Sequence, residues 1–366
     1  MHGLCRALAA RGHDVHVFTT SVDGDQDSDV PHGQPVDLDG VKVWYFQSRH
    51  ARRLYWAPAM RDALARQVHS FDIVHTHAIY LWPMWAAETA ARKAGVPYVI
   101  SPRGMLEKEL IHRKSAIMKG VLIGFIEKRK LERAAAIHVT SRREADEASA
   151  FGFDLPPFVE IPNGVTLEST GSEEPSPNVR ALVDRGPFLL FLGRVSWKKG
   201  VDRLIASLPY APNVTLVVAG VDDEDLIPRL QSQAATLGVA DRVVFVGAVE
   251  GADKSALLTH ASTLALTSYS ENFGNVVVEA MAMGLPVILT PEVGLSTFVA
   301  ETKSGIVVDG DPMELGGAVV RLMSDPALRQ QMGDRGRDLA ERHFTWSGVA
   351  EQMETAYQSI LQADVH

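Results

Sequence analysis

The sequence is poor in cysteine, in long hydrophobic runs and in excess positive charge, and each shortage excludes a class of protein. Its 366 residues include one cysteine, Cys5, so an intrachain disulfide and a multi-cysteine metal site are excluded. The longest hydrophobic run, at 120–126, is far shorter than the roughly 18 residues of a membrane-spanning helix. The formal net charge of −9 lacks the basic excess of nucleic-acid-binding proteins. With no signal-peptide pattern at the start, these shortages predict a cytoplasmic protein.

The composition is otherwise that of an ordinary globular chain. With 46% hydrophobic and 22% charged residues the chain is not disordered, and its length predicts about two domains. Apolar runs that predict strands occur at 14–20, 41–46, 71–77, 97–101, 135–141 and 158–164, and again at 188–195, 214–220, 242–249, 262–268, 284–290 and 304–309. Helical patterns separate these runs, which predicts an α/β fold of two doubly wound, Rossmann-like domains.

A stretch rich in Ser, Pro, Glu and Gly at 167–178 marks the boundary between the two halves. We therefore assign an N-terminal domain to 1–166, a linker to 167–180, a C-terminal domain to 181–344 and a last helix to 345–366, which could pack on either domain. The sequence opens within a helix, whereas a doubly wound domain ordinarily opens with a strand and a tight glycine loop. We expect the first strand to be missing through truncation or a misplaced start, with a shortened natural variant as the alternative.

The segment with the richest chemistry is 267–288, in which a strand, a polar loop and a helix starting near Asn275 follow one another. Main-chain N–H groups of Phe273, Gly274 and Asn275 at this helix N-terminus would suit a phosphate. Glu279, two turns inside the helix, could reach a ribose diol while Glu271 faces a sugar. A solvated Glu279 is the alternative. Its apolar neighbours disfavour that alternative, because a carboxylate among them needs a partner.

A second segment, 191–205, places two cations on one loop. Arg194 follows a predicted strand, Lys199 comes five residues later, and Gly193 lets the backbone bend closely. Two cations that flank a loop can clamp a diphosphate leaving group. Two solvated surface cations are an equal alternative when this spacing is taken alone. The acidic run at 222–225 is interpreted as a solvated turn rather than a metal site.

Together, GRVSWKKG at 193–200 and ENFGNVVVEAMAMGLPV at 271–287 resemble the retaining glycosyltransferases of family 4. HTH at 75–77 and IPNGV at 161–165 extend the resemblance over essentially the whole chain. The resemblance implies the GT-B fold, in which two doubly wound Rossmann-like domains face a cleft. It also implies transfer of a sugar from a nucleoside diphosphate to an acceptor hydroxyl, with retention at the anomeric carbon.

The resemblance implies a role for each residue of the two motifs. Arg194 and Lys199 match the pyrophosphate clamp, and Glu279 matches the ribose-binding glutamate. Glu271 matches the glutamate at the transferred sugar, beside the backbone of 273–275. The family needs no metal or other cofactor, and the base would be recognised near Val249.

The N-terminal domain departs from the family pattern in two places. The glycine-rich loop after the first strand is lacking, and Arg103 in YVISPRGM (98–105) stands where many members have a histidine. We expect Arg103 to bind a phosphate or a sugar hydroxyl, because a guanidinium cannot act as a general base at neutral pH. His75 and His77 are expected on opposite faces of one strand. We favour His77 as the residue that faces the cleft, with His75 packed in the interior.

Segment 103–133 carries 9 Lys and Arg residues against 4 Glu residues, interleaved with apolar side chains. A basic amphipathic helix of this kind could lie on an anionic membrane, whereas solvated cations above a core-covering apolar face are the alternative.

We therefore predict a metal-independent glycosyltransferase that uses a nucleotide-sugar donor, such as a UDP- or GDP-sugar. Its acceptor would be a sugar or a lipid-linked sugar, in envelope, exopolysaccharide or glycolipid assembly at the inner face of the membrane. The alternatives are a non-catalytic or truncated nucleotide-sugar-binding protein and, less favoured, a GT-B epimerase or phosphorylase. No nucleic-acid partner is expected.

Overall fold

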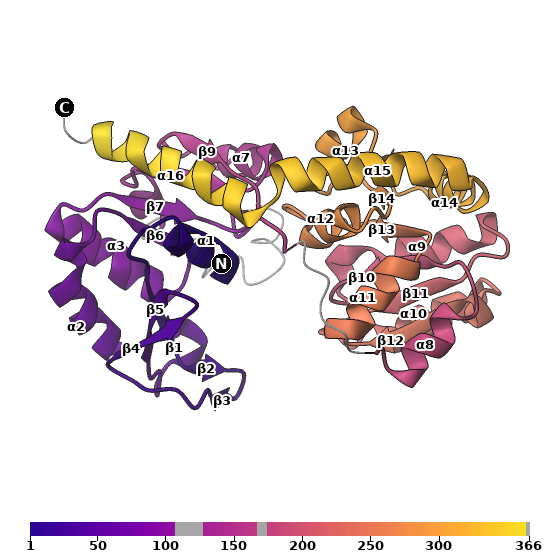
Figure 1. Cartoon of the computed structure of the whole chain (residues 1–366). Coiled ribbons are helices and arrows are strands. Elements are labelled where there is room, and N and C mark those ends of the chain that lie inside the picture. Colours follow the sequence, from indigo (N-terminus) through magenta and orange to yellow (C-terminus); the bar gives the residue numbers. More distant parts are fainter. Residues whose placement is uncertain (107–126, 167–173, 364–366) are drawn as a thin grey trace. The chain divides into compact units, whose positions relative to one another are not determined.

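The computed structural model describes residues 1–106, 127–166 and 174–363, which form two compact units (Figure 1). Unit 1 comprises residues 1–164 and 346–366, and unit 2 comprises residues 165–345. Residues 107–126, most of the predicted basic helix, lie outside the described residues, as do residues 167–173 of the predicted linker.

Unit 2 contains one sheet of six parallel strands in the order β12-β11-β10-β13-β14-β15. Every residue of β10, β11, β13 and β14 is buried, which explains why these strands are continuous apolar runs in the sequence. The strands are β10 (Leu189–Leu192), β11 (Leu216–Ala219), β12 (Val243–Gly247), β13 (Thr263–Leu266), β14 (Val287–Leu289) and β15 (Gly305–Val307). The helices are α8 (Pro177–Val183), α9 (Val201–Ser207), α10 (Ile227–Thr236), α11 (Gly251–His260), α12 (Asn275–Ala282), α13 (Ser296–Thr302), α14 (Pro312–Ser324) and α15 (Pro326–His343).

The strand order of unit 2 reverses between β10 and β13. From β10 the chain builds outward through β11 and β12, and it then returns to the other side of β10 to add β13, β14 and β15. In open α/β sheets, ligands bind beyond the carboxyl ends of the strands at such a switch point. The fold thus selects one place for a site before any side chain is considered.

Unit 1 contains two main sheets, which Figure 1 shows as separate groups of arrows. One has the order β1-β5-β4, with β1 parallel and β4 antiparallel to β5, and the other has the parallel order β6-β7-β8-β9. The strands are β1 (His16–Thr20), β4 (Pro35–Leu38), β5 (Val41–Phe46), β6 (Val74–His77), β7 (Tyr98–Ser101), β8 (Ala136–Val139) and β9 (Phe158–Glu160), with a small hairpin of β2 (Val22–Asp23) and β3 (Gln26–Asp27). The helices include α1 (His2–Ala10), α2 (Pro58–Gln67), α3 (Trp82–Ala94), α6 (Lys128–Leu131), α7 (Arg142–Ser149) and α16 (Trp346–Ala363).

The last helix, α16, packs on the first helix of the chain. Leu4 and Leu8 of α1 are buried against Val349 and Met353 of α16. Among the described helices, none is both long and apolar enough to cross a bilayer.

Candidate functional site

The carboxyl ends of β10 and β13 form the first candidate site, in unit 2. These strands are neighbours at the switch point, so the loops that follow them meet at one edge of the sheet. The Thr267 hydroxyl donates to the Gly200 carbonyl at 2.8 Å, and the Tyr269 N–H donates to the Lys198 carbonyl at 2.6 Å. The two loops that carry the predicted motifs are therefore bonded directly to each other.

Lys199 and Glu271 form an ion pair between these two loops. Their side chains are 20% and 17% exposed, so both are largely shielded but still reach the surface. Gly200, with a φ of +66°, permits the close approach, because a Cβ here would stand 2.0 Å from the Thr267 carbonyl oxygen. The structure thus brings together two residues that the sequence singled out in segments about 70 positions apart.

Arg203 of α9, which the sequence analysis missed, supports the same loop. Its guanidinium donates to the Thr267 carbonyl at 3.3 Å, and its central carbon lies 3.7 Å from the centre of the Tyr269 ring. It also pairs with Glu292 at 3.6 Å, and the Glu292 carbonyl accepts the Glu271 N–H at 3.1 Å. An arginine on a helix is too common for the sequence to signal this supporting role.

Helix α12 begins at Asn275, as predicted, and directs its N-terminal end to the same edge of the sheet. Gly274 precedes it with a φ of +92°, which favours glycine. The Phe273 side chain is 4% exposed and packs against Phe344, so only its main chain can meet a ligand. The helix dipole gives this end a partial positive charge, which suits a phosphate.

Glu279, also on α12, has the partner that its apolar neighbours led us to expect. Its carboxylate pairs with the ammonium of Lys254 on α11 at 2.9 Å, and its side chain is 28% exposed. Lys254 was missed because it lies 25 residues away on another helix, and no local pattern signals such a pair.

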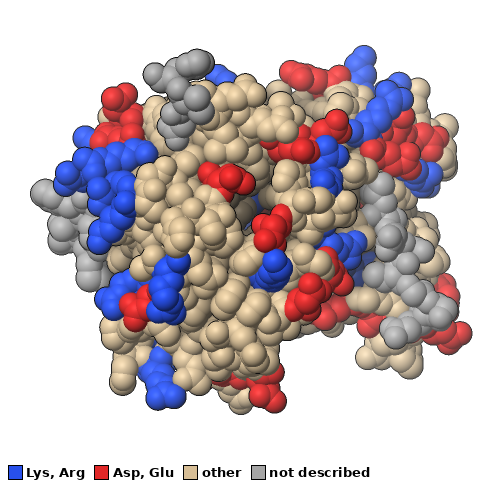
Figure 2. All heavy atoms as spheres, turned by 60° about the vertical axis from the view of Figure 1, so that its left-hand side comes forward, with Lys and Arg blue, Asp and Glu red and all other residues tan. Residues whose placement is uncertain are grey.

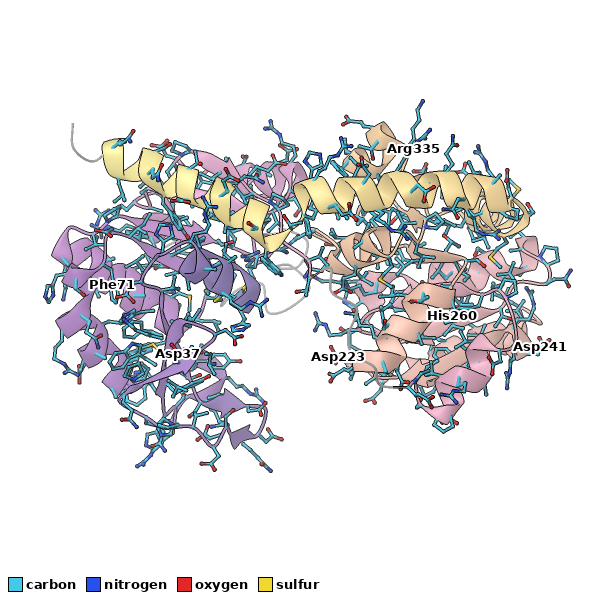
Figure 3. All side chains as sticks on the ribbon, viewed as in Figure 1. Asp37, Phe71, Asp223, Asp241, His260 and Arg335 are labelled. Atoms are coloured by element: carbon cyan, nitrogen blue, oxygen red, sulfur yellow. The ribbon has the colours of Figure 1, made fainter. Side chains whose placement is uncertain are left out.

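Arg194 pairs with Asp223 at 3.0 Å and has a side chain that is 72% exposed (Figure 3 labels Asp223). Arg194 therefore lies on the loop that follows β10, where Asp223 holds its guanidinium. The adjacent Asp222 accepts two main-chain N–H groups at the start of α10, each at 2.9 Å, so the acidic run forms a helix-capping turn. The described residues contain no cluster of three or more His, Cys, Asp or Glu side chains that could hold a metal ion.

Gly193 and Val249 lie in the loops that follow β10 and β12. Gly193 has a φ of +147°, and a Cβ on the neighbouring Gly220 would stand 1.8 Å from its carbonyl oxygen. Val249 is partly buried against the core of unit 2. Both positions therefore lie beyond the carboxyl ends of the strands, where the fold predicts a ligand site.

Unit 1 carries a second cluster of predicted residues, at the carboxyl ends of β6 and β7. The Arg103 guanidinium donates to Nδ1 of His77, with Nη2 at 3.0 Å, and to Oδ1 of Asn163 at 2.5 Å. Arg103 has a φ of +52°, an uncommon conformation for a residue other than glycine. Asn163 was not singled out, although it stands in the IPNGV segment.

The prediction that His75 and His77 point to opposite faces is wrong. Side chains alternate along a strand, so residues two apart share a face. The two rings stack with centroids 4.2 Å apart, and His138 lies edge-on to His75 at 5.2 Å. His75 Nδ1 is also 2.6 Å from the Tyr357 hydroxyl. What distinguishes His77 is therefore its contact with Arg103.

The histidines of this cluster are neutral at pH 7. Burial lowers the pKa of His75 and of His77 well below the ordinary value, and neighbouring imidazoles and Arg103 lower both further. Burial, with a smaller contribution from Arg103, lowers the pKa of His138 to about 4. A neutral His77 can accept the hydrogen bond from Arg103.

A buried carboxylate, Glu144 of α7, fixes the loop that carries Arg103. It accepts the Gly104 N–H at 2.7 Å and the Thr140 N–H at 2.8 Å. The Ser141 side chain accepts the Glu144 N–H at the start of the helix. A serine followed three residues later by a glutamate is the signal that could have found this position.

The described end of segment 103–133 covers the core with its apolar side chain. Leu131 of α6 is fully buried, whereas Arg129 and Arg133 are exposed. These two arginines, with Lys130 and Arg92, line a surface pocket of about 330 Å³. Figure 2 shows basic side chains gathered at the left edge of the face it presents. In this described part, the arrangement matches the core-covering alternative.

Comparison with solved structures establishes the class of fold. The structure is similar to sucrose-phosphate synthase from Thermosynechococcus elongatus, with a TM-score of 0.77 and 25% identity over 98% of this chain and 92% of that one. It is also similar to Anabaena HepE in complex with UDP and glucose, with a TM-score of 0.73 and 21% identity over 98% and 95% of the two chains. The fold is therefore GT-B, built from two Rossmann-like domains.

Comparison of sequences then identifies the family. Residues 172–339 match the family described as glycosyl transferases group 1, and residues 1–164 match the glycosyl transferase 4-like domain. D-inositol 3-phosphate glycosyltransferase from Xylanimonas cellulosilytica is 30% identical over 97% of this chain and 89% of that protein. Phosphatidyl-myo-inositol mannosyltransferase from Mycobacterium leprae is 29% identical over 98% and 91%. The chain belongs to the group 1 glycosyltransferases and is a glycosyltransferase.

Proposed function

We propose that this chain transfers a sugar from a nucleoside diphosphate to an acceptor hydroxyl with retention at the anomeric carbon. The observation that carries the proposal is the Lys199–Glu271 ion pair at the switch point of unit 2. The pair places a cation and a carboxylate beside the N-terminal end of α12. A diphosphate needs a nearby cation, and the sugar attached to it needs a nearby acceptor for its hydroxyl groups.

The leaving diphosphate gains negative charge in the transition state, and the site offers positive charge to stabilise it. Lys199, Arg194 and the main chain at 273–275 are the groups that we assign to the diphosphate. Because these groups supply the charge, we propose a reaction that needs no metal. Glu279 is assigned to the ribose hydroxyls, and Glu271 to hydroxyls of the transferred sugar.

Unit 1 is assigned to the acceptor. Within the described residues, His77 and Asn163 use three of the five N–H donors of Arg103, and we assign the other two to a phosphate or hydroxyl of an acceptor. The names of the two sequence relatives point to inositol phosphates or phosphatidylinositol as acceptors. We therefore propose a phosphorylated cyclitol or a lipid-linked sugar as acceptor, in envelope or glycolipid assembly at the inner face of a membrane.

A thermal-unfolding panel with UDP, GDP, ADP and dTDP tests the donor site. Saturation at about 100 times Kd should stabilise the chain by roughly 2.7 kcal/mol with the preferred base. Lys199→Ala should abolish the shift, whereas Lys198→Ala, in the same loop, should retain it. A chain that responds to none of the four nucleotides would contradict the proposal.

A second experiment separates transfer from binding alone. The alternative is a protein that binds nucleotide sugars without transfer. A cavity of about 480 Å³ in unit 1, lined by residues next to β1 and β6, favours it. Incubation with the nucleotide sugar and inositol phosphate, followed by NMR of the product, should show a glycoside with the donor's anomeric configuration. An inverted product would refute retention, and tight binding with no turnover of any acceptor would support the alternative.

A further inference from the structure

A surface pocket of about 330 Å³ lies at the amino end of β7 in unit 1, where Tyr98 lines it. Helix α3 packs against β6 and β7 and leads from the end of β6 back to the start of β7, so its last turn lies at the same edge (Figure 1). Arg103 follows the carboxyl end of β7, and the length of that strand separates the two places by roughly 10 Å. The pocket is therefore distinct from the site that we assign to the acceptor.

The pocket is lined mainly by cations. Among the described residues that line it, one side chain is acidic and four are basic, namely Glu88 and Arg92, Arg129, Lys130 and Arg133. The three arginines are exposed, and none of them makes a hydrogen bond or ion pair with another described residue. Burial and then Glu88 raise the pKa of Tyr98, whereas Arg133 and Arg92 lower it. Two of the three guanidiniums therefore lie close to the Tyr98 hydroxyl.

The carboxylate on the buried side of the pocket already has a partner. Glu88 is 2% exposed, and it accepts a hydrogen bond from the Lys130 ammonium at 2.8 Å. The same ammonium donates to the Trp85 carbonyl at 3.1 Å, and the Tyr98 hydroxyl donates to the Lys130 carbonyl at 2.8 Å. Burial raises the pKa of Glu88 to about 7 despite this partner, which reduces its negative charge near neutral pH. Because Lys130 and Glu88 cancel, the three arginines leave the pocket positively charged on a chain whose net charge is −9.

The arginines and the size of the pocket favour a small phosphate ester as ligand. Guanidiniums bind phosphate oxygens through paired N–H donors, and three of them can neutralise a doubly charged phosphate group. The volume lies at the lower end of the range for small-molecule sites, so a phosphate with a small polar group attached would fit. The helix dipole explains a cation in the last turn of α3, such as Arg92. It does not explain why arginines from two separate segments border one hollow.

We propose that this pocket binds the doubly charged phosphate group of a phosphate monoester, which is either a soluble polyol phosphate or a lipid headgroup. Arg129 and Arg133 supply guanidiniums from the segment around α6, and Arg92 supplies one from α3. The Thr89 hydroxyl, which lines the same pocket, can bond to a polar group of the ester. Binding here needs neither the donor loops of unit 2 nor the transfer reaction, so the site goes beyond the proposed function.

Titration of the full chain with glycerol 3-phosphate, followed by backbone-amide NMR, tests the phosphate site. We expect saturable shifts of the amides of Arg92, Arg129 and Arg133. A pocket variant that combines Arg129→Gln with Arg133→Gln should bind at least about tenfold more weakly, because two charge-assisted contacts are lost. The matched control combines Arg66→Gln with Arg142→Gln, which removes the same charge from exposed positions outside the pocket. This control variant should bind as tightly as the parent chain.

Co-sedimentation with phosphatidylcholine vesicles, with and without phosphatidic acid, tests the lipid source, because phosphatidic acid presents the same phosphate monoester on a membrane. Binding that requires phosphatidic acid and is at least about tenfold weaker in the pocket variant than in the control variant would identify a lipid headgroup. Binding of glycerol 3-phosphate without vesicle binding would identify a soluble ester. The proposal is overturned if neither probe binds, or if the pocket variant binds each probe as well as the control variant does. Neither readout involves sugar transfer, so such a failure would leave the proposed function intact.

Discussion

The Lys199–Glu271 ion pair gives a sharp test of the proposed donor site, because substitution of each residue should affect a different step. Loss of Lys199 should weaken donor binding, whereas loss of Glu271 should slow transfer. Lys199→Ala removes a cation that we assign to the diphosphate. A hydrogen bond to a charged group contributes about 1.5–3 kcal/mol, so the variant should bind the nucleoside diphosphate roughly 10- to 100-fold more weakly. Transfer should fall at least as far, since the same cation stabilises the leaving group.

Glu271→Gln should have the opposite effect on binding. In the structure this carboxylate holds the Lys199 ammonium, so it competes with a bound phosphate. Two unit charges about 4 Å apart attract by up to roughly 4 kcal/mol near a protein surface, and partial exposure of both side chains reduces this value. Removing the competitor should leave binding unchanged or make it tighter. Transfer should fall by about 10²–10³-fold if the carboxylate stabilises charge at the sugar.

Calorimetric titration with the nucleoside diphosphate at fixed ionic strength measures the first effect, and initial rates with saturating donor measure the second. Lys198→Ala is the matched control, because it removes a cation from the same loop. If both variants of the pair lost binding equally, the pair would be structural. If Glu271→Gln retained full turnover, the role assigned to this carboxylate would be refuted.

Three further predictions concern Glu279 and Gly200 of unit 2 and His138 of unit 1. Glu279→Ala should reduce the preference for a ribonucleoside diphosphate over its 2′,3′-dideoxy form from about tenfold or more to near one in a binding assay; an unchanged ratio would exclude a ribose contact. Gly200→Ala should destabilise unit 2 by at least about 1–2 kcal/mol, measured by calorimetry, because its φ of +66° and the nearby Thr267 carbonyl oppose a side chain. Burial lowers the pKa of His138 to about 4, so the unfolded chain binds more protons between pH 6.5 and 4 and stability should fall as pH falls through that window. His138→Gln should reduce this loss by up to about 3 kcal/mol, and unfolding curves with equal pH dependence in both proteins would contradict the assignment.

The sheet of unit 2 and the loops that carry its candidate site could be predicted from the sequence because their signals are local. Strands such as β10 and β11 are buried on both faces, so they are continuous apolar runs in the sequence. Glu271 and the start of α12 lie in one contiguous motif. Lys254 and Arg203 could not be found in this way, because their roles depend on how separate helices pack beside the site loops.

Unit 1 was harder to predict for a different reason. Its apolar runs gave β6, β7 and β8, but the short antiparallel strand β4 has only one partly buried residue and no apolar pattern. The predicted orientation of His75 was wrong because the two-residue period of a strand was misapplied. The sequence itself contained what was needed to place His75 and His77 on one face. The Arg103–Asn163 contact joins residues 60 positions apart, which a single sequence does not reveal.

The ion pairs of unit 2 balance the charges of the proposed site when no donor is bound, and each pair contains a residue that we assign to the donor. Lys199 is paired with Glu271, and Lys254 with Glu279, so the charges are balanced inside partly shielded loops. When a diphosphate binds, Lys199 can exchange its carboxylate for a phosphate, which releases Glu271 to accept a sugar hydroxyl. A ribose at Glu279 would compete with Lys254 in the same way. Each exchange replaces one charge-assisted contact by another, so its net cost is small. An anion without a sugar leaves the released carboxylate without a hydroxyl partner, and the site should therefore favour the intact donor over free phosphate.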